Sequence, residues 1–223
     1  EGLDYAFVIS GFDYLNSLES FRNGLFYVQD VSSMMVAEYA KPEHGDHVID
    51  VCAAPGGKST HIAELLNGSG FVEARDLTDY KVSLIEENIK RHGLSNMGAV
   101  CMDATVFDEA SVEKADILIC DLPCSGLGVL GRKKDIRYKM TEQSLDGLAE
   151  LQKEILDTVH TYVRKGKKLI YSTCTMNPAE NEENVRWFIN RYPEFELETS
   201  KQMFPKEIGN DGFFIAVLKR NGR

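Results

Sequence analysis

The sequence predicts an α/β domain of the Rossmann-like type, with a mainly parallel sheet covered by helices on both faces. Short apolar runs alternate with helical patterns from about residue 48 onward, and a strand that returns through a helix pairs parallel with the strand before it. Four of the apolar runs end in an aspartate, and the first leads into a turn of small residues that opens a helix. A length of 223 residues suits one such domain with at most a small appendage.

The first forty residues carry a weaker pattern than the rest. Three apolar residues between positions 15 and 21 are spaced for one face of a short helix, and residues 24–30 indicate a turn and an extended piece. Asp30 or Ser32 can cap a helix that continues to about residue 40. Pro42 and Gly45 end this helix, so the sheet begins after them.

From there, strands and helices alternate to the end of the chain. Apolar runs predict strands at 48–52, 71–75, 98–102, 115–120 and 168–172. Helical spacing predicts helices at 58–66, 78–92, 141–164 and 178–190, with a long loop at 122–140. Two further strands, at 195–198 and 213–218, are expected to pair with each other.

The turn after the first strand is the strongest local signal. Residues 53–57 are Ala-Ala-Pro-Gly-Gly, and small residues let a ligand approach the backbone while the N–H groups of the next helix face it. A Walker loop is excluded because Cys52 stands where its first glycine belongs, and no G-x-G-x-x-G motif is present. Two interpretations stay open. The turn is either an ordinary strand–helix connection or a site for another adenosine-containing cofactor, with S-adenosylmethionine as the leading candidate.

Acidic residues end four successive strands, at Asp50, Asp76, Asp103 and Asp121. The carboxyl ends of parallel strands share one edge of the sheet, and ligands bind at that edge in such folds. One acid there is common, but four in register are hard to explain by solubility alone. We therefore expect at least two of them to serve a cofactor.

The chain has five cysteines, an odd number whose spacings match no zinc pattern. Cys52, Cys101 and Cys120 lie in or at the ends of apolar runs, as buried free thiols do. We expect no metal site and a reducing, cytoplasmic setting. Cys124 and Cys174 differ, because each follows a strand at the ligand edge, where a partly exposed thiol can be activated as a nucleophile.

The net charge of −10 argues against a stand-alone nucleic-acid binder, whose affinity comes from Lys and Arg. Two basic clusters stand out against it, one made of Arg164, Lys165, Lys167 and Lys168 and one of Arg132, Lys133, Lys134, Arg137 and Lys139. Such clusters are more often solvated surface than binding sites, unless they lie beside a catalytic motif. No apolar run approaches 18 residues, so neither a membrane span nor a membrane partner is expected.

Four motifs occur in one order along the chain: D-V-C-A-A-P-G-G-K from Asp50, D-L-P-C-S-G from Asp121, S-T-C-T from Ser172 and N-P-A-E-N-E-E-N-V from Asn177. In this combination the sequence resembles the Nop/Sun family of RNA cytosine-C5 methyltransferases. Within that family it looks most like the bacterial Sun-type (Fmu-type) enzymes that act on small-subunit, 16S, ribosomal RNA. The resemblance runs from about residue 24 to the C-terminus and includes D-G-F-F-I-A near the end.

The resemblance implies a role for each motif residue. The segment Cys52, Ala53, Ala54, Pro55, Gly56, Gly57 and Lys58 would wrap the methionine end of S-adenosylmethionine, and Lys58 would face a carboxylate or the target site. Asp76 would accept from the ribose hydroxyls, and Asp103 would lie near the adenine. Asp121 would lie between cofactor and target base, with Cys174 as the nucleophile and Cys124 as the cysteine that helps release the product.

The resemblance also implies the fold and the partner. The expected sheet has seven strands in the order 3-2-1-4-5-7-6, with the last strand antiparallel. Because the basic loop follows D-L-P-C directly, Arg132, Lys133, Lys134 and Arg137 are expected to contact the RNA backbone. Residues 1–40 would be an N-terminal extension that packs on a catalytic domain at 41–223.

The sequence departs from the family in two places. Lys134 precedes Asp135-Ile136 where family members often have proline. Many Sun-type proteins also carry an N-terminal helical RNA-binding domain that has no counterpart in these 223 residues, which begin at Glu1 rather than Met. We therefore expect a piece of a longer protein that binds RNA weakly by itself.

Three other functions compete with ribosomal RNA methylation. The same chemistry on transfer RNA stays open, because contacts outside these motifs set the target. A non-catalytic ribosome-assembly factor that keeps the fold is disfavoured by intact Cys124, Cys174 and Asp121. An amino-group methyltransferase usually carries an aromatic residue after D/N-P-P, and Cys124 is incompatible with that motif. The oligomeric state is not encoded in any of these patterns.

Overall fold

Seven strands form one sheet in the order β3-β2-β1-β4-β5-β7-β6 in the computed structural model, which describes residues 3–205 and 210–222. Their bounds are β1 His47–Asp50, β2 Phe71–Asp76, β3 Met97–Cys101, β4 Ala115–Asp121, β5 Val163–Thr173, β6 Phe195–Met203 and β7 Phe213–Arg220. Only β7 is antiparallel to its neighbours. The predicted fold class and strand order are therefore confirmed, as is the pairing of the last two strands.

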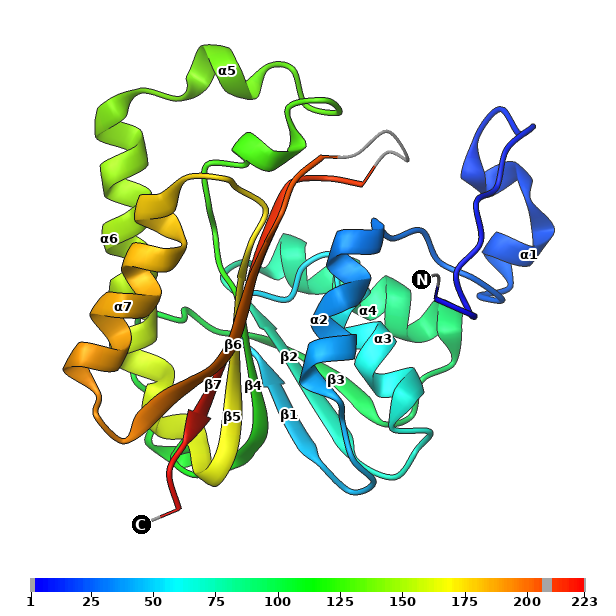
Figure 1. The fold of residues 1–223 in the computed structure, drawn as a ribbon. Helices are drawn as coiled ribbons and strands as arrows, with labels where there is room; N and C mark the ends of the chain where they lie inside the picture. The colour runs from blue at the N-terminus through cyan, green and yellow to red at the C-terminus, as the bar shows by residue number, and fades with distance from the viewer. Residues whose placement is uncertain (1–2, 206–209, 223) are drawn as a thin grey trace.

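Helices cover both faces of this sheet (Figure 1). Their bounds are α1 Glu19–Arg22, α2 Val31–Ala40, α3 Gly57–Leu65, α4 Asp79–His92, α5 Ile136–Lys139, α6 Glu142–Val159 and α7 Glu182–Arg191. In Figure 1, α6 and α7 lie on the left of the sheet, and α2, α3 and α4 lie on the right. Short 3₁₀ segments occur at Leu15–Ser17, Glu109–Ser111, Leu127–Val129, His160–Tyr162 and Pro178–Glu180.

The core has two halves because successive side chains of a strand point to opposite faces. In β4, Leu118 packs with Ile155 and Phe188 on the side of α6 and α7. Its neighbour Ile119 packs with Val36 and Ile62 on the side of α2 and α3. Burial on both faces explains why residues 117–120 of β4 form an unbroken apolar run rather than an alternating one.

The predicted helix at 141–164 is wrong at its C-terminal end. The structure ends α6 at Val159, and a 3₁₀ turn carries the chain into β5 at Val163. Gly166 has a φ of 80°, and the pairing of β4 with β5 shifts register between Ala115 and Ile117. The first residues of β5 therefore form an irregular strand, in which charged residues follow one another instead of alternating with apolar ones.

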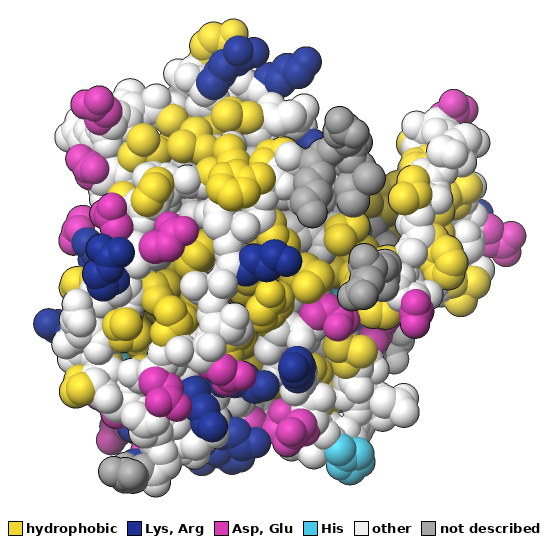
Figure 2. All heavy atoms as spheres, in the orientation of Figure 1, with side chains coloured by type: hydrophobic (Ala, Val, Ile, Leu, Met, Phe, Trp, Pro, Cys, Tyr) yellow, Lys and Arg dark blue, Asp and Glu magenta, His cyan; other side chains and the backbone are white. Residues whose placement is uncertain are grey.

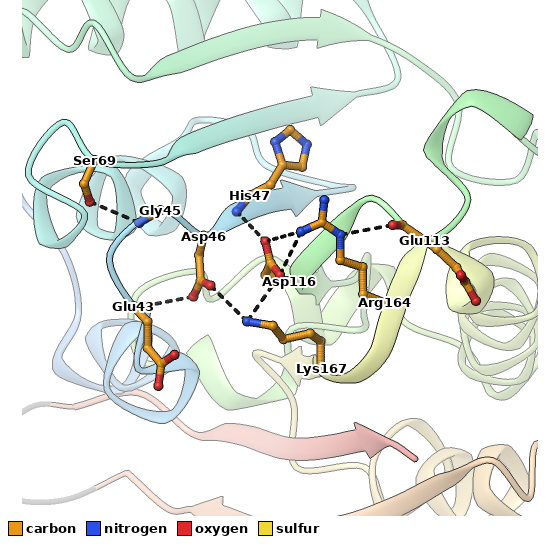
Figure 3. Close-up of polar contacts among 9 residues, drawn as sticks. All are labelled: Glu43, Gly45, Asp46, His47, Ser69, Glu113, Asp116, Arg164 and Lys167. Carbon is orange, nitrogen blue, oxygen red and sulfur yellow. Dashed lines mark hydrogen bonds and ion pairs between the residues drawn. The ribbon is translucent and has the colours of Figure 1, made fainter. Parts of the chain in front are cut away.

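An ion cluster at the amino edge of the sheet explains this irregular start (Figure 3). Arg164 and Lys167 of β5 both contact the carboxylate of Asp116, at 3.0 Å and 3.2 Å. Lys167 also contacts Asp46 at 3.2 Å, and the other Asp116 contact is the backbone N–H of His47. Two of the four residues of the basic cluster at 164–168 therefore join β5 to β1 and β4.

The other predicted elements shift by a few residues. The helix expected at 178–190 begins as a 3₁₀ turn and becomes α-helical at Glu182. The strand expected at 195–198 continues to Met203, and the loop at 122–140 contains both a 3₁₀ turn and α5. No helix within residues 3–205 and 210–222 has the length and apolar character that crossing a membrane requires.

Near the N-terminus, Tyr5 contacts α2 and α3, whereas α1 lies apart from them at the right of the molecule (Figure 1). The Tyr5 hydroxyl donates to Glu38 Oε1 at 2.6 Å, and its ring lies edge-on to His61 at 5.1 Å between centroids. In α2 itself, Val36, Ala37 and Ala40 are fully buried in the core. The division of the chain at residue 40 stays a prediction.

Candidate active site

The acids that end the strands lie along one edge of the sheet, where the turn after β1 and the loop after β4 also begin. Asp50, Asp76 and Asp121 are the last residues of β1, β2 and β4, and Asp103 lies two residues beyond β3. Figure 1 shows the loop after β4 rising above this edge toward α5. The sheet therefore brings the four predicted acids to a common edge, although their surroundings differ.

The turn after β1 is held against the end of β2 by its backbone N–H groups. Ala53 N donates to the carbonyl of Arg75 at 2.8 Å, and Ala54 N donates to Asp76 Oδ2 at 2.9 Å. Gly56 has a φ of 106°, which side chains rarely adopt, and it precedes α3 without a side-chain cap. The first N–H groups of α3 have no acceptor within the helix, so they are available to a ligand.

Asp50 lies beneath this turn and is completely buried. Ser59 Oγ donates to its Oδ2 at 2.6 Å. Burial raises the pKa of the Asp50 carboxyl to about 7, although the Ser59 hydrogen bond opposes this shift. A cationic or hydrogen-donating ligand at the turn would favour its ionised form.

Lys58 and Asp121 form an ion pair in the centre of the edge. Lys58 Nζ lies 2.7 Å from Asp121 Oδ2, and Ser172 Oγ donates to Asp121 Oδ1 at 2.7 Å. Burial alone would lower the pKa of Lys58, but Asp121 reverses this and holds that pKa above its ordinary value. Register places Ser172 opposite Asp121 in the β4–β5 pair, so the sheet itself orients this carboxylate.

The two predicted catalytic cysteines are in contact. Cys124 Sγ lies 3.2 Å from Cys174 Sγ, and the backbone N–H of Cys174 donates to Cys124 Sγ at 3.3 Å. The contact with Cys124 lowers the pKa of the Cys174 thiol, and Lys58 acts in the same direction. The same contact, together with burial, raises the pKa of Cys124 well above its ordinary value. Cys174 is therefore the more acidic thiol of the pair.

A buried carboxylate holds the two cysteine loops together. Glu180 accepts from Ser125 N at 2.8 Å, from Ser125 Oγ at 2.5 Å, and from Gln152 and Asn177 at 3.0 Å each. Ser125 Oγ also lies 2.8 Å from Thr175 Oγ1. Ser125 follows Cys124 and Thr175 follows Cys174, so this network fixes the backbone beside both thiols.

The remaining predicted residues lie in more varied surroundings. Asp103 accepts from the N–H and hydroxyl of Thr105, which lowers the pKa of its carboxyl. Lys133, Lys134 and Arg137 are exposed, and the Arg137 guanidinium lies 5.3 Å from the ring centroid of Tyr138. Arg132 is instead paired with Asp30 and Asp211. The Lys139 side chain lies outside the described part of the structure.

Sequence reasoning missed the residues that support the site. Ser59, Ser172 and Glu180 were given no role, although each bonds or orients a predicted site residue. Two signals were available. Glu180 lies in N-P-A-E-N-E-E-N-V, where an acid follows a helix-opening proline, and Ser172 opens S-T-C-T at the end of an apolar strand.

The residues of the turn fit S-adenosylmethionine. This cofactor carries a carboxylate, an amino group and ribose hydroxyls. Free N–H groups at the start of α3 suit the carboxylate, and buried Asp50 and Asp76 suit the donors. Small residues at 53–57 leave the backbone accessible. Among residues 3–205 and 210–222, no group of three or more His, Cys, Asp or Glu side chains is arranged to hold a metal ion.

Comparison with known proteins places the chain among RNA methyltransferases. Residues 37–219 match the family model described as 16S rRNA methyltransferase RsmB/F. A probable ribosomal RNA small subunit methyltransferase B from Bacillus subtilis is 41% identical over 220 residues, which cover 91% of this chain and 49% of the relative. The tRNA (cytosine(72)-C(5))-methyltransferase from Pyrococcus horikoshii is 35% identical over 218 residues, covering 92% and 55%.

A solved structure agrees with these relatives. The crystal structure of NSun6 from Pyrococcus horikoshii with SFG superposes with a TM-score of 0.86 at 34% identity, covering 95% of this chain and 57% of that one. The chain spans about half the length of the curated relatives it matches.

Proposed function

The chain belongs to the 16S rRNA methyltransferase RsmB/F family, and we propose that it methylates C5 of a cytosine in RNA through a covalent bond between Cys174 and C6 of the base. One observation carries this proposal: a thiol of lowered pKa, Cys174, lies against a second thiol, Cys124, at the sheet edge that holds the Lys58–Asp121 pair. Two adjacent thiols beside a carboxylate suit an addition that must later be reversed.

The methyl donor of this methyltransferase family is S-adenosylmethionine. When bound, it supplies a methyl group on a positively charged sulfur. The turn at 53–57 and the first N–H groups of α3 would hold its methionine end, with Asp76 toward the ribose and Asp103 toward the adenine. Asp50, which ionises only near pH 7 in the free protein, would be drawn to its ionised form by the positive charge.

The cysteine is needed because C5 of cytosine is a poor nucleophile. The Cys174 thiolate adds to C6, and the electron pair displaced from the C5–C6 bond makes C5 enamine-like. Asp121, held by Lys58 and Ser172, supports this addition beside N3 and N4 of the base. After C5 is methylated, loss of the C5 proton restores the C5–C6 double bond and expels the Cys174 thiolate. Cys124 lies close enough to assist this release.

RNA must reach this edge with the target base unpaired or flipped out of a helix, because C6 is inaccessible within a stack. Lys133, Lys134 and Arg137 are exposed in the loop that follows Cys124, and they are proposed to contact the RNA backbone. Figure 2 shows Lys and Arg side chains beside hydrophobic ones at the top of the molecule, where Figure 1 places α5. Basic and aromatic groups together suit single-stranded RNA.

Small-subunit ribosomal RNA is the proposed target, because the matching family model and the Bacillus subtilis relative both bear that description. Transfer RNA is the second candidate, since the Pyrococcus horikoshii relative is a tRNA (cytosine(72)-C(5))-methyltransferase. Residues 1–40 are proposed to act as an extension packed on the catalytic domain. Five free cysteines suit a reducing, cytoplasmic setting.

Three proteins supplied with labelled S-adenosylmethionine and RNA test the mechanism: the unmodified chain, Cys174→Ala and Cys124→Ala. We expect Cys174→Ala to lose methylation and to form no adduct, because the nucleophile is gone. We expect Cys124→Ala to accumulate a protein–RNA adduct that survives denaturing electrophoresis, because release is impaired. Methylation of cytosine C5 by Cys174→Ala would show that the mechanism is wrong. Mapping the modified nucleotide would decide between ribosomal and transfer RNA.

A further inference from the structure

Three segments that are distant in the sequence meet around Asp30, the residue that caps α2. Its Oδ1 accepts from Ser32 N at 2.9 Å and from the backbone N–H of Asp211 at 3.2 Å. Its Oδ2 pairs with the guanidinium of Arg132, and Arg132 Nε lies 3.2 Å from Asp211 Oδ1. The Asp30 side chain is only 8% exposed, and Asp211 is 15% exposed. We call Asp30, Arg132 and Asp211 the edge clamp.

The edge clamp continues to the backbone of Cys174 through two glycines. Gly212, next to Asp211, donates its N–H to the carbonyl of Gly128 at 2.9 Å. Gly128 donates its own N–H to the carbonyl of Cys174 at 3.0 Å. A Cβ on Gly128 would lie 2.0 Å from Gly212 O and 2.8 Å from Cys174 O. The loop after β4, the loop before β7 and the Cys174 segment therefore touch without intervening side chains.

We propose that the edge clamp is a positioning device: Arg132, held by Asp30 and Asp211, fixes the loop after β4 on the back of the Cys174 segment and so keeps Cys124 and Cys174 in contact. The proposal rests on the proposed function for its catalytic consequence. The effect of the edge clamp on the contact between Cys124 and Cys174 does not depend on that function. This role of Arg132 differs from the RNA contact proposed for Lys133, Lys134 and Arg137, with which it shares a basic run in the sequence.

The charges around Arg132 support this different role. Arg132 is flanked by two carboxylates, which would repel an approaching phosphate and already accept from its guanidinium. Asp30 holds the N–H of Asp211 and the cap of α2 with the same oxygen, so the carboxylate is committed to this junction. An arginine oriented by two acids from two other segments is suited to joining those segments.

Matched variants separate positioning from RNA contact. Arg132→Ala removes the edge clamp, and Arg132→Lys keeps the charge with fewer donors. Asp30→Asn removes one charge but keeps an oxygen that can cap α2. Lys133→Ala is the control, because it removes the same charge from the adjacent exposed position. Circular dichroism and thermal unfolding verify that each variant is folded.

The first measurement needs neither RNA nor cofactor. Iodoacetamide labelling of Cys174, followed by peptide mapping against the other four cysteines, is recorded against pH. The charged or titratable groups that face Cys174 are Cys124, Asp121 and Lys58. Loss of the contact with Cys124 should raise the labelling midpoint of Arg132→Ala and Asp30→Asn by about half a pH unit or more. Arg132→Lys should lie between these and the unmodified chain, and Lys133→Ala should keep the original midpoint.

The second measurement is steady-state methylation of RNA. Arg132→Ala and Asp30→Asn should lower kcat about tenfold with the KM for RNA little changed, as expected for misplaced reacting groups. Lys133→Ala should instead raise the KM for RNA. If Arg132→Ala raises KM, and both Arg132→Ala and Asp30→Asn keep the labelling midpoint, Arg132 is an RNA contact and the edge clamp is wrong. A chain that methylates no RNA would refute the proposed function while leaving the labelling result to decide the edge clamp.

Discussion

At the scale of single residues, the two thiols of the site differ because their partners differ. Cys174 lies beside Lys58 and Cys124, and the pKa of its thiol is lowered by the Cys124 contact. Cys124 accepts from the Cys174 N–H, and the thiol contact with Cys174, together with burial, raises the pKa of its own thiol. Cys174 is therefore the more acidic thiol of the pair. This asymmetry supports the proposal that Cys174 is the nucleophile.

Asp50 provides a prediction about stability and pH. Its pKa is about 7 in the folded chain against 3.8 for an ordinary carboxyl, so the folded state binds its proton more tightly than the unfolded state. Its contribution to stability is therefore fully present below pH 3.8 and is lost as the pH rises toward 7. We expect Asp50→Asn, which keeps an acceptor for Ser59, to be more stable than the unmodified chain at pH 8 by up to about 4 kcal/mol.

Urea unfolding of both proteins at several pH values between 4.5 and 8 measures this difference. The advantage of Asp50→Asn should grow with pH across this range, because only the unmodified chain must ionise a buried carboxyl or retain its proton. The exposed Asp146→Asn, on α6, controls for the loss of one carboxylate. A difference between Asp50→Asn and the unmodified chain that does not vary with pH would rule out the raised pKa.

At the scale of elements, close backbone contact between two loops decides the geometry behind the cysteines. A methyl group added at Gly128 would lie 2.0 Å from the Gly212 carbonyl, so the loops must separate. We expect Gly128→Ala to lower the free energy of unfolding by about 1–3 kcal/mol, as overpacking does. We also expect it to slow methylation, because the loops behind the cysteines separate. Gly131→Ala is the matched control, since its Cβ would have no atom within 4 Å. Thermal unfolding of the two variants measures the contrast, and equal stabilities would refute the contact.

The helices and strands were predictable from the sequence wherever a segment showed a single hydrophobic pattern, either a strand run or helical spacing. The apolar runs within β4 and β5, at 117–120 and 169–171, were found because strand segments buried on both faces are continuous apolar runs. The end of α6 was missed because residues 160–164 carry no stop signal of their own. The chain turns into β5 there because Arg164 and Lys167 reach two acids that lie 48 or more positions earlier in the sequence.

In the candidate site too, the positions set by the strands were predictable and the contacts made by the loops were not. The shared edge of Asp50, Asp76 and Asp121 was predicted from their positions at strand ends, because parallel strands bring their carboxyl ends to one edge of the sheet. The contact between Lys58 and Asp121, the four hydrogen bonds to Glu180 and the pairing of Arg132 depend on how loops fold back on that edge. No periodicity encodes such long-range contacts, so residues in one basic run were assigned one role although the structure pairs one of them with two acids.

At the scale of the whole molecule, opposite charges are concentrated in different places. The net charge is −10, and many acids are neutralised locally, as at the amino edge, where Arg164 and Lys167 contact Asp116 (Figure 3). Despite its burial, the pKa of Asp116 is held below its ordinary value by the His47 N–H, Lys167 and Arg164. These contacts therefore stabilise the fold above about pH 4 and are lost in stronger acid. Lys133 and Lys134, in contrast, are exposed at the opposite edge of the sheet.

This charge distribution predicts weak and strongly salt-dependent RNA binding, with the loop after β4 as the contributing surface. Each lysine that contacts a phosphate adds about 0.7 to the slope of log affinity against log salt for single-stranded RNA. We expect the double variant Lys133→Ala, Lys134→Ala to bind RNA less tightly and to lower this slope by about 1.4. Lys165→Ala, exposed in the irregular start of β5, should keep the slope. Fluorescence anisotropy of a labelled RNA across a salt series measures both quantities, and a slope that the double variant leaves unchanged would place the RNA on another face.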